Sequence, residues 1–443
     1  MLSGSARISA SPHLPRSELV MPSAVRATLE TPGTRPPGPP AVPRSRRYAF
    51  GFWAATLAFV VNMAIIAVPT PLYVLYQQRD HFSTIMLTVV YAVYAAGVIL
   101  SLFLGGHLSD WFGRKRVFVP ALLLNAAAGL VFLCVPSLPG LFVGRIVSGV
   151  AVGLATGTVG AYLGELHAAR PAGTGSPHRP QIVVAAANLG GIAIGPLIAG
   201  LLATFAPHPL RLPYLVFVVA LVVLTGLVAL APETATPQVP RPRYRAQRIA
   251  VPRHARRSFF AATATSLAAF AVYGIFNSLA PSFLAVTLHQ NSHAVAGAVA
   301  FAVFASGAAI QIAMSRAGLR TTLRAAPVIL IPGLVLLAVG MWFALLPLFV
   351  VGGVVVGAGA ALAFRGGLSA AAASAPPESR AEVLSGFFLG TYIGLSVPAV
   401  ILGIATEYVS SRAAMLVFAV IVAVAIVLST RVLRSARPHT EGR

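Results

Sequence analysis

The sequence predicts an all-α integral membrane protein of twelve transmembrane helices, built as two pseudo-symmetric six-helix halves around a central cavity. Of its 443 residues, 57% are hydrophobic and only 9% are charged, and the mean hydropathy is +0.84. Apolar runs of about 20 residues, the length of helix that crosses a hydrocarbon core of roughly 30 Å, recur throughout the chain. Short sequence landmarks also recur in the same order in both halves, which indicates duplication.

The apolar runs divide the chain regularly. They begin near residues 50, 84, 117, 140, 181 and 213, and again near residues 258, 295, 326, 348, 383 and 412. Residues 49–232 form the predicted N-terminal half, and residues 258–431 form the predicted C-terminal half. The sixth and twelfth runs have almost no polar groups and should face lipid. The first, fourth, fifth, seventh and tenth runs carry Asn, Arg, Thr or glycine clusters and should face the interior.

Three polar segments lie outside the two halves. Residues 1–48 are rich in Pro, Arg and Ser and lack the apolar region of a signal peptide, so we expect a disordered cytoplasmic tail. Residues 233–257 form a basic cytoplasmic linker, and residues 432–443 form a second cytoplasmic tail.

The placement of the cations predicts the orientation in the membrane. The formal net charge is +22, from 32 Lys and Arg residues against 10 Asp and Glu residues. With a cytoplasmic N-terminus, the outer loops hold only Arg79, Arg211 and Arg412, and nearly all other cations lie on the inner side. This bias follows the positive-inside rule and accounts for the charge without a nucleic-acid partner. It predicts that both termini lie in the cytoplasm. The abundance of Arg over Lys, with many Ala residues, is compatible with a GC-rich bacterial genome, so we expect a multi-pass protein of the cell (inner) membrane.

The repeated landmarks keep a nearly constant offset. TPLY at residues 70–73 is echoed by APSF at residues 280–283, so that its proline recurs after 210 residues (281 − 71). Pro196 is echoed by Pro398 after 202 residues (398 − 196). Matches in order and at similar spacing support two related halves.

Three motifs in the N-terminal half carry a family resemblance. GGHLSDWFGRKRV matches the pattern G-x-L-x-D-x-x-G-R-K/R through Gly106, Leu108, Asp110, Gly113, Arg114 and Lys115. GRIVSGVAVG matches R-x-x-x-G through Arg145 and Gly149. GIAIGPLIAG matches G-x-x-x-G-P-x-x-x-G through Gly191, Gly195, Pro196 and Gly200. With these motifs, the chain from about residue 50 to 431 resembles the major facilitator superfamily, which implies a secondary transporter that works by alternating access.

The resemblance also implies roles. The third motif is associated with antiporters of the family, which implies efflux, and its small residues suit close helix packing. Proton-coupled drug exporters of the family commonly carry an acid in the first helix, where this chain has Asn62. Proton coupling therefore stays open, as do two alternatives: uptake of an organic acid or another nutrient, and a sensor that does not transport.

The loop after the second run is the predicted cytoplasmic gate. Its members are Gly106, Asp110, Gly113 and Arg114, together with Glu165 at the inner end of the fourth run. We expect Glu165 to form an ion pair with Arg114, and Asp110 to meet the N-terminus of a neighbouring helix. We expect the cluster to stabilise an outward-facing conformation; a topological anchor with no switching role is the alternative.

Nine polar residues within the runs are candidates for the substrate cavity. They are Asn62, Tyr94, Arg145, Asn188, Tyr273, Asn277, Gln311, Arg365 and Tyr392. Within the membrane, a charged side chain costs about 2.5 to 3.5 kcal/mol on insertion scales, so Arg145 needs a compensating partner. Arg145 either hydrogen-bonds backbone carbonyls in a structural role or binds substrate and relays coupling. Arg365 lies near the inner face, from which it can snorkel. The amides and hydroxyls could alternatively bond a neighbouring helix.

The chemistry of the runs restricts the substrate and the reaction class. None of the ten acids falls in the middle of the predicted membrane, so a neutral or anionic small molecule is tolerated and a cation is not. The sequence has a single cysteine, Cys134, and no cluster of catalytic or metal-ligating groups. We therefore expect that the protein is not an enzyme and binds no cofactor. No G-x-x-x-x-G-K-[ST] phosphate loop occurs, which disfavours ATP-driven pumping.

Overall fold

The structure, a computed structural model, describes residues 44–105, 108–170, 178–235, 251, 255–375 and 380–435, which contain no strand. In chain order the helices are α1 Arg44–Ile65, α2 Pro69–Asp80, α3 Thr84–Gly105, α4 Leu108–Phe112, α5 Arg114–Cys134, α6 Leu138–Ala168, α7 Arg179–Phe205, α8 Leu212–Ala229, α9 Arg256–Ser278, α10 Ala280–Val286, α11 His293–Ala313, α12 Leu319–Trp342, α13 Leu346–Ala373, α14 Arg380–Tyr408 and α15 Ser411–Ser435. Outside the described residues lie Gly106 of the predicted gate and most of the predicted tails and linker: 1–43, 236–250, 252–254 and 436–443.

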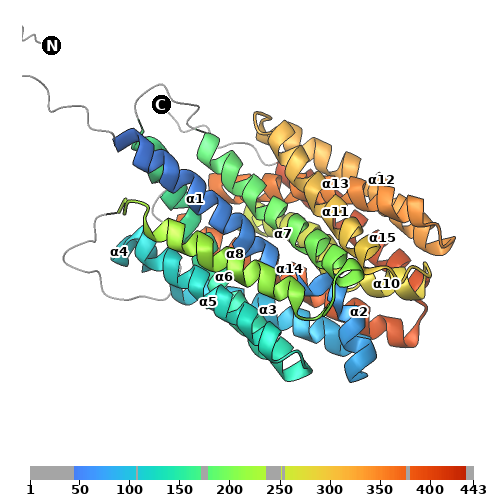
Figure 1. The fold of residues 1–443 in the computed structure, drawn as a ribbon. Coiled ribbons are helices and arrows are strands. Elements are labelled where there is room, and N and C mark those ends of the chain that lie inside the picture. Colours follow the sequence, from blue (N-terminus) through green and yellow to red (C-terminus); the bar gives the residue numbers. More distant parts are fainter. Residues whose placement is uncertain are drawn as a thin grey trace, which may run out of the picture. The chain divides into compact units, whose positions relative to one another are not determined.

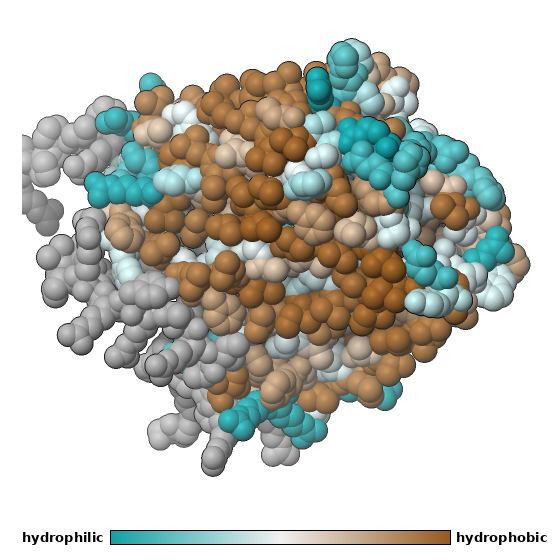
Figure 2. Space-filling view, turned by 90° about the horizontal axis from the view of Figure 1, so that it is seen from below, coloured by the Kyte–Doolittle hydropathy of each residue, from teal (hydrophilic) through white to brown (hydrophobic). Residues whose placement is uncertain are grey.

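Within the described residues, twelve stretches of helix are long and apolar enough to cross a membrane, which agrees with the predicted number. α1 and α2 together form the first span, and α10 follows α9 after a break, whereas α4 is a short helix between the second and third spans. Figure 2 shows a broad apolar belt on one face of the molecule, with hydrophilic side chains toward its ends. Such a belt suits the hydrocarbon region of a bilayer.

The helices pair in the same way in both halves (Figure 1). In the first half, α3 and α5 each pack on α6, and α1 packs on α7. In the second half, α11 and α12 each pack on α13, and α9 packs on α14. The halves meet along two related contacts, α7 on α11 and α14 on α3. This repeated pairing is typical of duplicated six-helix units.

A proline breaks the first span and leaves one carbonyl group free. α1 ends at Ile65 and α2 begins at Pro69, whose nitrogen carries no hydrogen for a helical bond. In the break, the N–H of Thr70 donates to the carbonyl of Ala67 at 3.1 Å. The carbonyl of Ile66, which Thr70 would bond in a regular helix, is therefore open to a side-chain donor.

A proline breaks the seventh span at the corresponding point. α9 ends at Ser278, and α10 begins at Ala280, immediately before Pro281. Because Pro281 cannot donate four residues back, the carbonyl of Asn277 also lacks its helical partner. The repeated TPLY and APSF words thus lie at the start of the helix that follows each break.

Glycines bring α6 against α3. A Cβ atom on Gly149 would collide with the carbonyl oxygen of Tyr94, and one on Gly97 would lie 2.7 Å from the carbonyl oxygen of Ile146. The two helices therefore touch backbone to backbone, which only glycine permits. This contact fixes the depth and direction of Arg145, one turn before Gly149 on α6.

The glycines of the fifth-span motif face two different helices. A Cβ atom on Gly191 or Gly195 would collide with backbone carbonyls of α1, in the same half. Gly200 instead faces α11 of the other half, where the position of its missing Cβ is 3.2 Å from the Cα of Gly297. Pro196 lies inside α7, and its carbonyl oxygen lies against Gly297. α7 therefore packs closely within its half and across the two halves.

Candidate functional site

Arg145 of α6 is fully buried, and its guanidinium bridges the break in the first span. Its Nη1 donates to the free carbonyl of Ile66 at 2.6 Å, and its Nη2 donates to the hydroxyl of Tyr73 on α2. The planar fork of arginine donors suits contacts on both sides of such a break. A charged side chain buried in a membrane span needs hydrogen-bond partners. For Arg145 these partners are a backbone carbonyl and a tyrosine hydroxyl.

Tyrosine rings surround the guanidinium without neutralising it. Its Cζ lies 5.6 Å from the ring centroid of Tyr73 and 5.8 Å from each of those of Tyr91 and Tyr94. Rings at this distance stabilise a cation through their quadrupoles. No carboxylate among the described residues pairs with Arg145, and its Nε is buried without a hydrogen-bond partner. The cluster therefore keeps a positive charge and an unused donor.

Asn277 of α9 connects the second half to this cluster. The hydroxyl of Thr70 on α2 is 2.6 Å from its side-chain oxygen and 3.0 Å from its free backbone carbonyl oxygen. The Nδ2 of Asn277 donates to the hydroxyl of Tyr91 at 3.4 Å. Because Tyr91 faces Arg145 and Thr70 lies one turn from Tyr73, the two halves meet at the arginine cluster.

Two further hydrogen bonds join the halves at the end of the molecule opposite the start of α1. The hydroxyl of Ser282 donates to the side-chain oxygen of Gln77 at 3.4 Å. The backbone N–H of Ala294 on α11 donates to the hydroxyl of Thr204 on α7 at 2.9 Å. By the predicted orientation this is the outer end, so the halves are joined there in this structure.

Aromatic side chains line the second half. Tyr273 donates to the carbonyl of Gly357 at 2.8 Å and stacks on Phe304, with ring centroids 4.9 Å apart. Phe270 contacts Tyr273 and Tyr392 edge to face, at 6.1 and 6.2 Å between centroids. Of these residues, Phe270 and Tyr392 are partly exposed, so they offer ring surface to a bound molecule.

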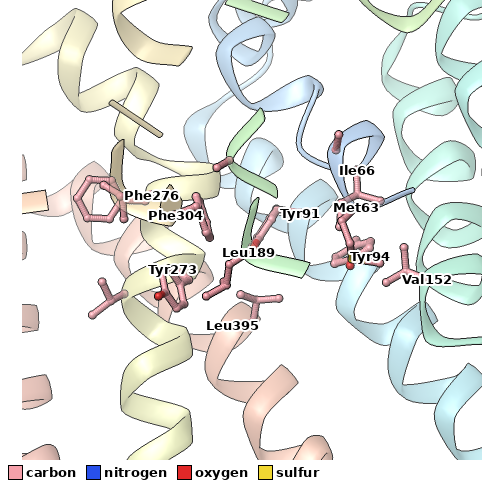
Figure 3. Packing of buried hydrophobic residues seen from close by; sticks show 14 of the residues in the cluster. Met63, Ile66, Tyr91, Tyr94, Val152, Leu189, Tyr273, Phe276, Phe304 and Leu395 are labelled. Atoms are coloured by element: carbon pink, nitrogen blue, oxygen red, sulfur yellow. The ribbon is translucent and has the colours of Figure 1, made fainter. Parts of the chain in front are cut away.

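Figure 3 shows how the two groups of aromatic residues lie. Tyr91, Leu189 and Leu395 stand between Tyr273 on one side and Tyr94 on the other. The two leucines are almost fully buried, on α7 and α14 respectively. The interior thus combines one cationic cluster in the first half with an apolar and aromatic surface in the second.

Asn62 and Asn188 lie in different surroundings. The amide nitrogen of Asn125 on α5 donates to the side-chain oxygen of Asn62 at 2.8 Å and to its backbone oxygen at 3.0 Å. Asn62 therefore ties α1 to α5 within the first half. Asn188 is partly exposed on α7, next to Leu189.

Arg365 belongs to α13, and its side chain contacts the C-terminal end of α11. Its guanidinium donates to the carbonyls of Gln311 at 3.3 Å and Ser315 at 2.7 Å, and so caps the C-terminus of that helix. Gln311 takes part in this contact through its backbone and is partly exposed. Neither residue joins the cluster around Arg145.

The predicted cytoplasmic gate contains a charged cluster. The Nε of Arg114 lies 3.0 Å from Glu165 Oε1, which confirms the expected ion pair. The Nη1 of Arg114 lies 2.5 Å from Asp110 Oδ1, so Asp110 pairs within its own motif in this structure. The hydroxyl of Thr234 donates to the other oxygen of Glu165 at 2.5 Å. The cluster thus joins the start of α5, the end of α6 and the segment after α8.

Glu233 caps the N-terminus of α5. Its carboxylate accepts the backbone N–H groups of Lys115 at 3.2 Å and Arg116 at 3.3 Å, at the positive end of the helix dipole. Gly113 precedes the helix with φ of 106°, a conformation that favours glycine. A Cβ atom there would also lie 2.8 Å from Glu233 Oε2. Gly113 therefore serves both the turn and the cap.

The sequence alone does not single out Thr70, Tyr73, Tyr91 and Glu233. Thr70 and Tyr73 belong to TPLY, which we read only as a landmark of duplication, although a proline break frees carbonyls for neighbouring side chains. Tyr91 precedes Tyr94 by three residues, a spacing that places both on one helix face. Glu233 directly follows a span, where an acid can reach a neighbouring helix terminus.

The two related halves, the twelve spans and the polar cluster between the halves define a multi-pass membrane transporter. No group of three or more His, Cys, Asp or Glu residues in the described part of the chain could hold a metal ion. The sequence model of the Major Facilitator Superfamily matches residues 52–331 and 267–443. The chain belongs to this superfamily.

Solved transporter structures share the fold at low sequence identity. The human organic anion transporter MFSD10 is 14% identical, with a TM-score of 0.61, over 89% of this chain and 100% of that one. A variant of the nucleoside transporter NupG is 14% identical, with a TM-score of 0.66, over 86% and 98%. A bacterial homologue of the human lysosomal transporter Spinster, inward-facing and unoccupied, is 14% identical, with a TM-score of 0.63, over 87% and 98%. No curated protein sequence matches the chain.

Proposed function

We propose that this chain is a secondary active transporter of the cell membrane that exports a small anionic or neutral organic molecule by alternating access. The observation that carries the proposal is the buried guanidinium of Arg145, which no described carboxylate neutralises. In a medium of low dielectric constant, such a charge attracts an anion and repels a cation. The unused Nε supplies a donor for that anion.

The surroundings of Arg145 support a link between binding and conformational change. Its other donors hold Ile66 and Tyr73, on the two sides of the break in the first span. An anion at the guanidinium competes for these donors and so weakens the hold of α6 on α2. Because Thr70 on α2 bonds Asn277 of the other half, the same event reaches the contact between the halves.

The direction of transport and the role of protons rest on further features. Export is supported by the resemblance of the fifth-span motif, from Gly191 to Gly200, to that of antiporters. If a proton gradient drives transport, the candidate proton carriers are Asp110 and Glu165, which both pair with Arg114, and His107, which lies outside the described residues. The structural neighbour described as an organic anion transporter agrees with the preference for an anion.

Transport by purified protein in proteoliposomes tests the proposal. A panel of carboxylate, neutral polar and quaternary ammonium solutes is measured with and without an imposed pH gradient. We expect uptake of an anionic or neutral solute, and no uptake of the ammonium compounds. Arg145→Met should reduce transport of the anionic solute at least about tenfold, since a paired buried charge is worth well over 1.4 kcal/mol.

Two variants control for charge and geometry. Arg324→Met removes the same charge from an exposed position of α12 and should leave transport unchanged. Arg145→Lys keeps the charge but lacks the forked donors, and should restore only part of the activity. Transport of a quaternary ammonium dye that depends on Arg145 would contradict the proposed substrate class. Failure of every solute to move would favour a sensor.

A further inference from the structure

A second cationic cluster lies at the end of the molecule where α1 and α7 begin and α6 ends. The guanidinium Cζ of Arg170 is 4.7 Å from the ring centroid of Phe52, and that of Arg179 is 5.8 Å from the ring centroid of Trp53. The two rings are adjacent on α1 and meet edge to face, with centroids 5.4 Å apart. Two arginines are thus held side by side by aromatic surfaces.

Within the described part of the chain, the charges of this cluster lack a counterion. No ion pair of either arginine occurs among the described residues, and the segment between them, residues 171–177, contains no acid. Glu165, the nearest acid along α6, already pairs with Arg114. Burial and the positive charge of Arg179 lower the pKa of Arg170. Two uncompensated cations so close together favour a bound anion.

The cluster also has unused hydrogen-bond donors. The Nε of Arg170 and the Nδ1 of His167 are buried without a hydrogen-bond partner in the described structure. Among the described residues, the Nη2 of Arg170 makes one hydrogen bond, a long one of 3.4 Å, to the carbonyl of Ala49. The ring of His167 lies 6.0 Å from that of Phe52 by centroids. A phosphate oxygen between these groups would satisfy donors that the protein leaves open.

The surface below the cluster suits lipid tails. Phe50, Trp53 and Leu57 are 43, 46 and 52% exposed, and their spacing places them on one face of α1. This apolar stripe runs along α1 past the two arginines, from Phe50 toward the middle of the membrane span. Basic groups between helices on the cytoplasmic side, above an apolar surface, are typical of sites for anionic lipid headgroups.

We propose that Arg170, Arg179 and His167 bind the phosphate of an anionic phospholipid in the cytoplasmic leaflet, with Phe50, Trp53 and Leu57 against its acyl chains. The site is separate from Arg145 and does not depend on the proposed substrate. Inorganic phosphate has the same charged group, but only a lipid also uses the apolar stripe.

Quenching of Trp53 fluorescence by brominated lipids tests the site directly. The other tryptophans are removed by Trp111→Phe and Trp342→Phe, and the protein is reconstituted with brominated phosphatidylglycerol or brominated phosphatidylcholine. We expect phosphatidylglycerol to bind about tenfold more strongly than phosphatidylcholine at Trp53, because two arginines near the membrane surface attract its negative charge. Arg170→Gln with Arg179→Gln should bring the two lipids to within about twofold of each other.

Two matched double variants test whether the lipid preference depends on the charges at this site. Arg320→Gln with Arg324→Gln removes the same charge from exposed positions of α12, and should keep the preference. Arg170→Lys with Arg179→Lys keeps the charge and should retain much of the preference for phosphatidylglycerol. This variant can be compared with the wild type if the glutamine pair does not fold. An unchanged preference in the glutamine pair, or an equal loss in the α12 pair, would refute the site. Relief of quenching by millimolar inorganic phosphate would overturn the lipid assignment in favour of a free anion.

Discussion

Replacing Asn277 with alanine should shift the transporter toward a conformation with its outer end open. The side chain receives a hydrogen bond from Thr70 at 2.6 Å and donates a longer one to Tyr91 at 3.4 Å, both across the two halves. Side-chain hydrogen bonds between membrane helices average about 0.6 kcal/mol and reach about 1.7 kcal/mol. The loss of this pair should therefore cost about 1 to 2 kcal/mol, which corresponds to a roughly 5- to 30-fold shift in the equilibrium.

Distances between spin labels at the outer end report this shift. Labels at Gln78 and Ser410, both exposed and in different halves, can be attached through cysteines after the exposed Cys134 is replaced by alanine. Double electron–electron resonance should show a new, longer distance in Asn277→Ala. Ser278→Ala is the matched control, because the Ser278 hydroxyl bonds the carbonyl of Gly274 within its own helix. Equal distance distributions in the two variants would refute the reasoning.

Three further substitutions test packing and capping. Gly149→Ala should force α6 away from α3 and lower stability by about 1 to 3 kcal/mol. Gly160→Ala is the control, because Gly160 has open space around it and its replacement should leave stability unchanged. Thermal unfolding of the two variants measures the difference. Glu233→Gln should lower the melting temperature through loss of about 0.3 to 1 kcal/mol at the N-terminus of α5, with a smaller effect in high salt. Arg365→Met should destabilise the end of α11 by about 1 to 2 kcal/mol while the ratio of transport rates among solutes stays constant; a changed ratio would place Arg365 in the cavity after all.

The helices could be predicted from the sequence because a membrane allows the backbone few alternatives. Without water, each span must satisfy its own hydrogen bonds as a helix, so the apolar runs give the number of spans directly. The ion pair of Arg114 with Glu165 was also predictable, since the two residues lie at the same end of neighbouring spans, where opposite charges can meet. Arg145 stands out for a similar reason: a charge within a span is rare and needs a partner.

The remaining contacts depend on the rotation of each helix about its axis. In apolar runs without a polar stripe, rotation is set by close packing, and the sequence shows no contrast from which to read it. Asn62 therefore could not be assigned in advance to Asn125 of its own half rather than to the cavity. Asn277 meets Thr70 across 207 residues, a pairing that arises only when the two halves come together.

The contact of Gly200 with Gly297 limits how sequences of this type can diverge. Most packing faults can be repaired by a second mutation that shrinks the opposing side chain, but no residue is smaller than glycine. Since the Cβ position of Gly200 lies 3.2 Å from the Cα of Gly297, neither position can compensate for a change in the other. Relatives that keep this spacing of α7 and α11 should retain both glycines, while interior side chains away from this contact remain free to change.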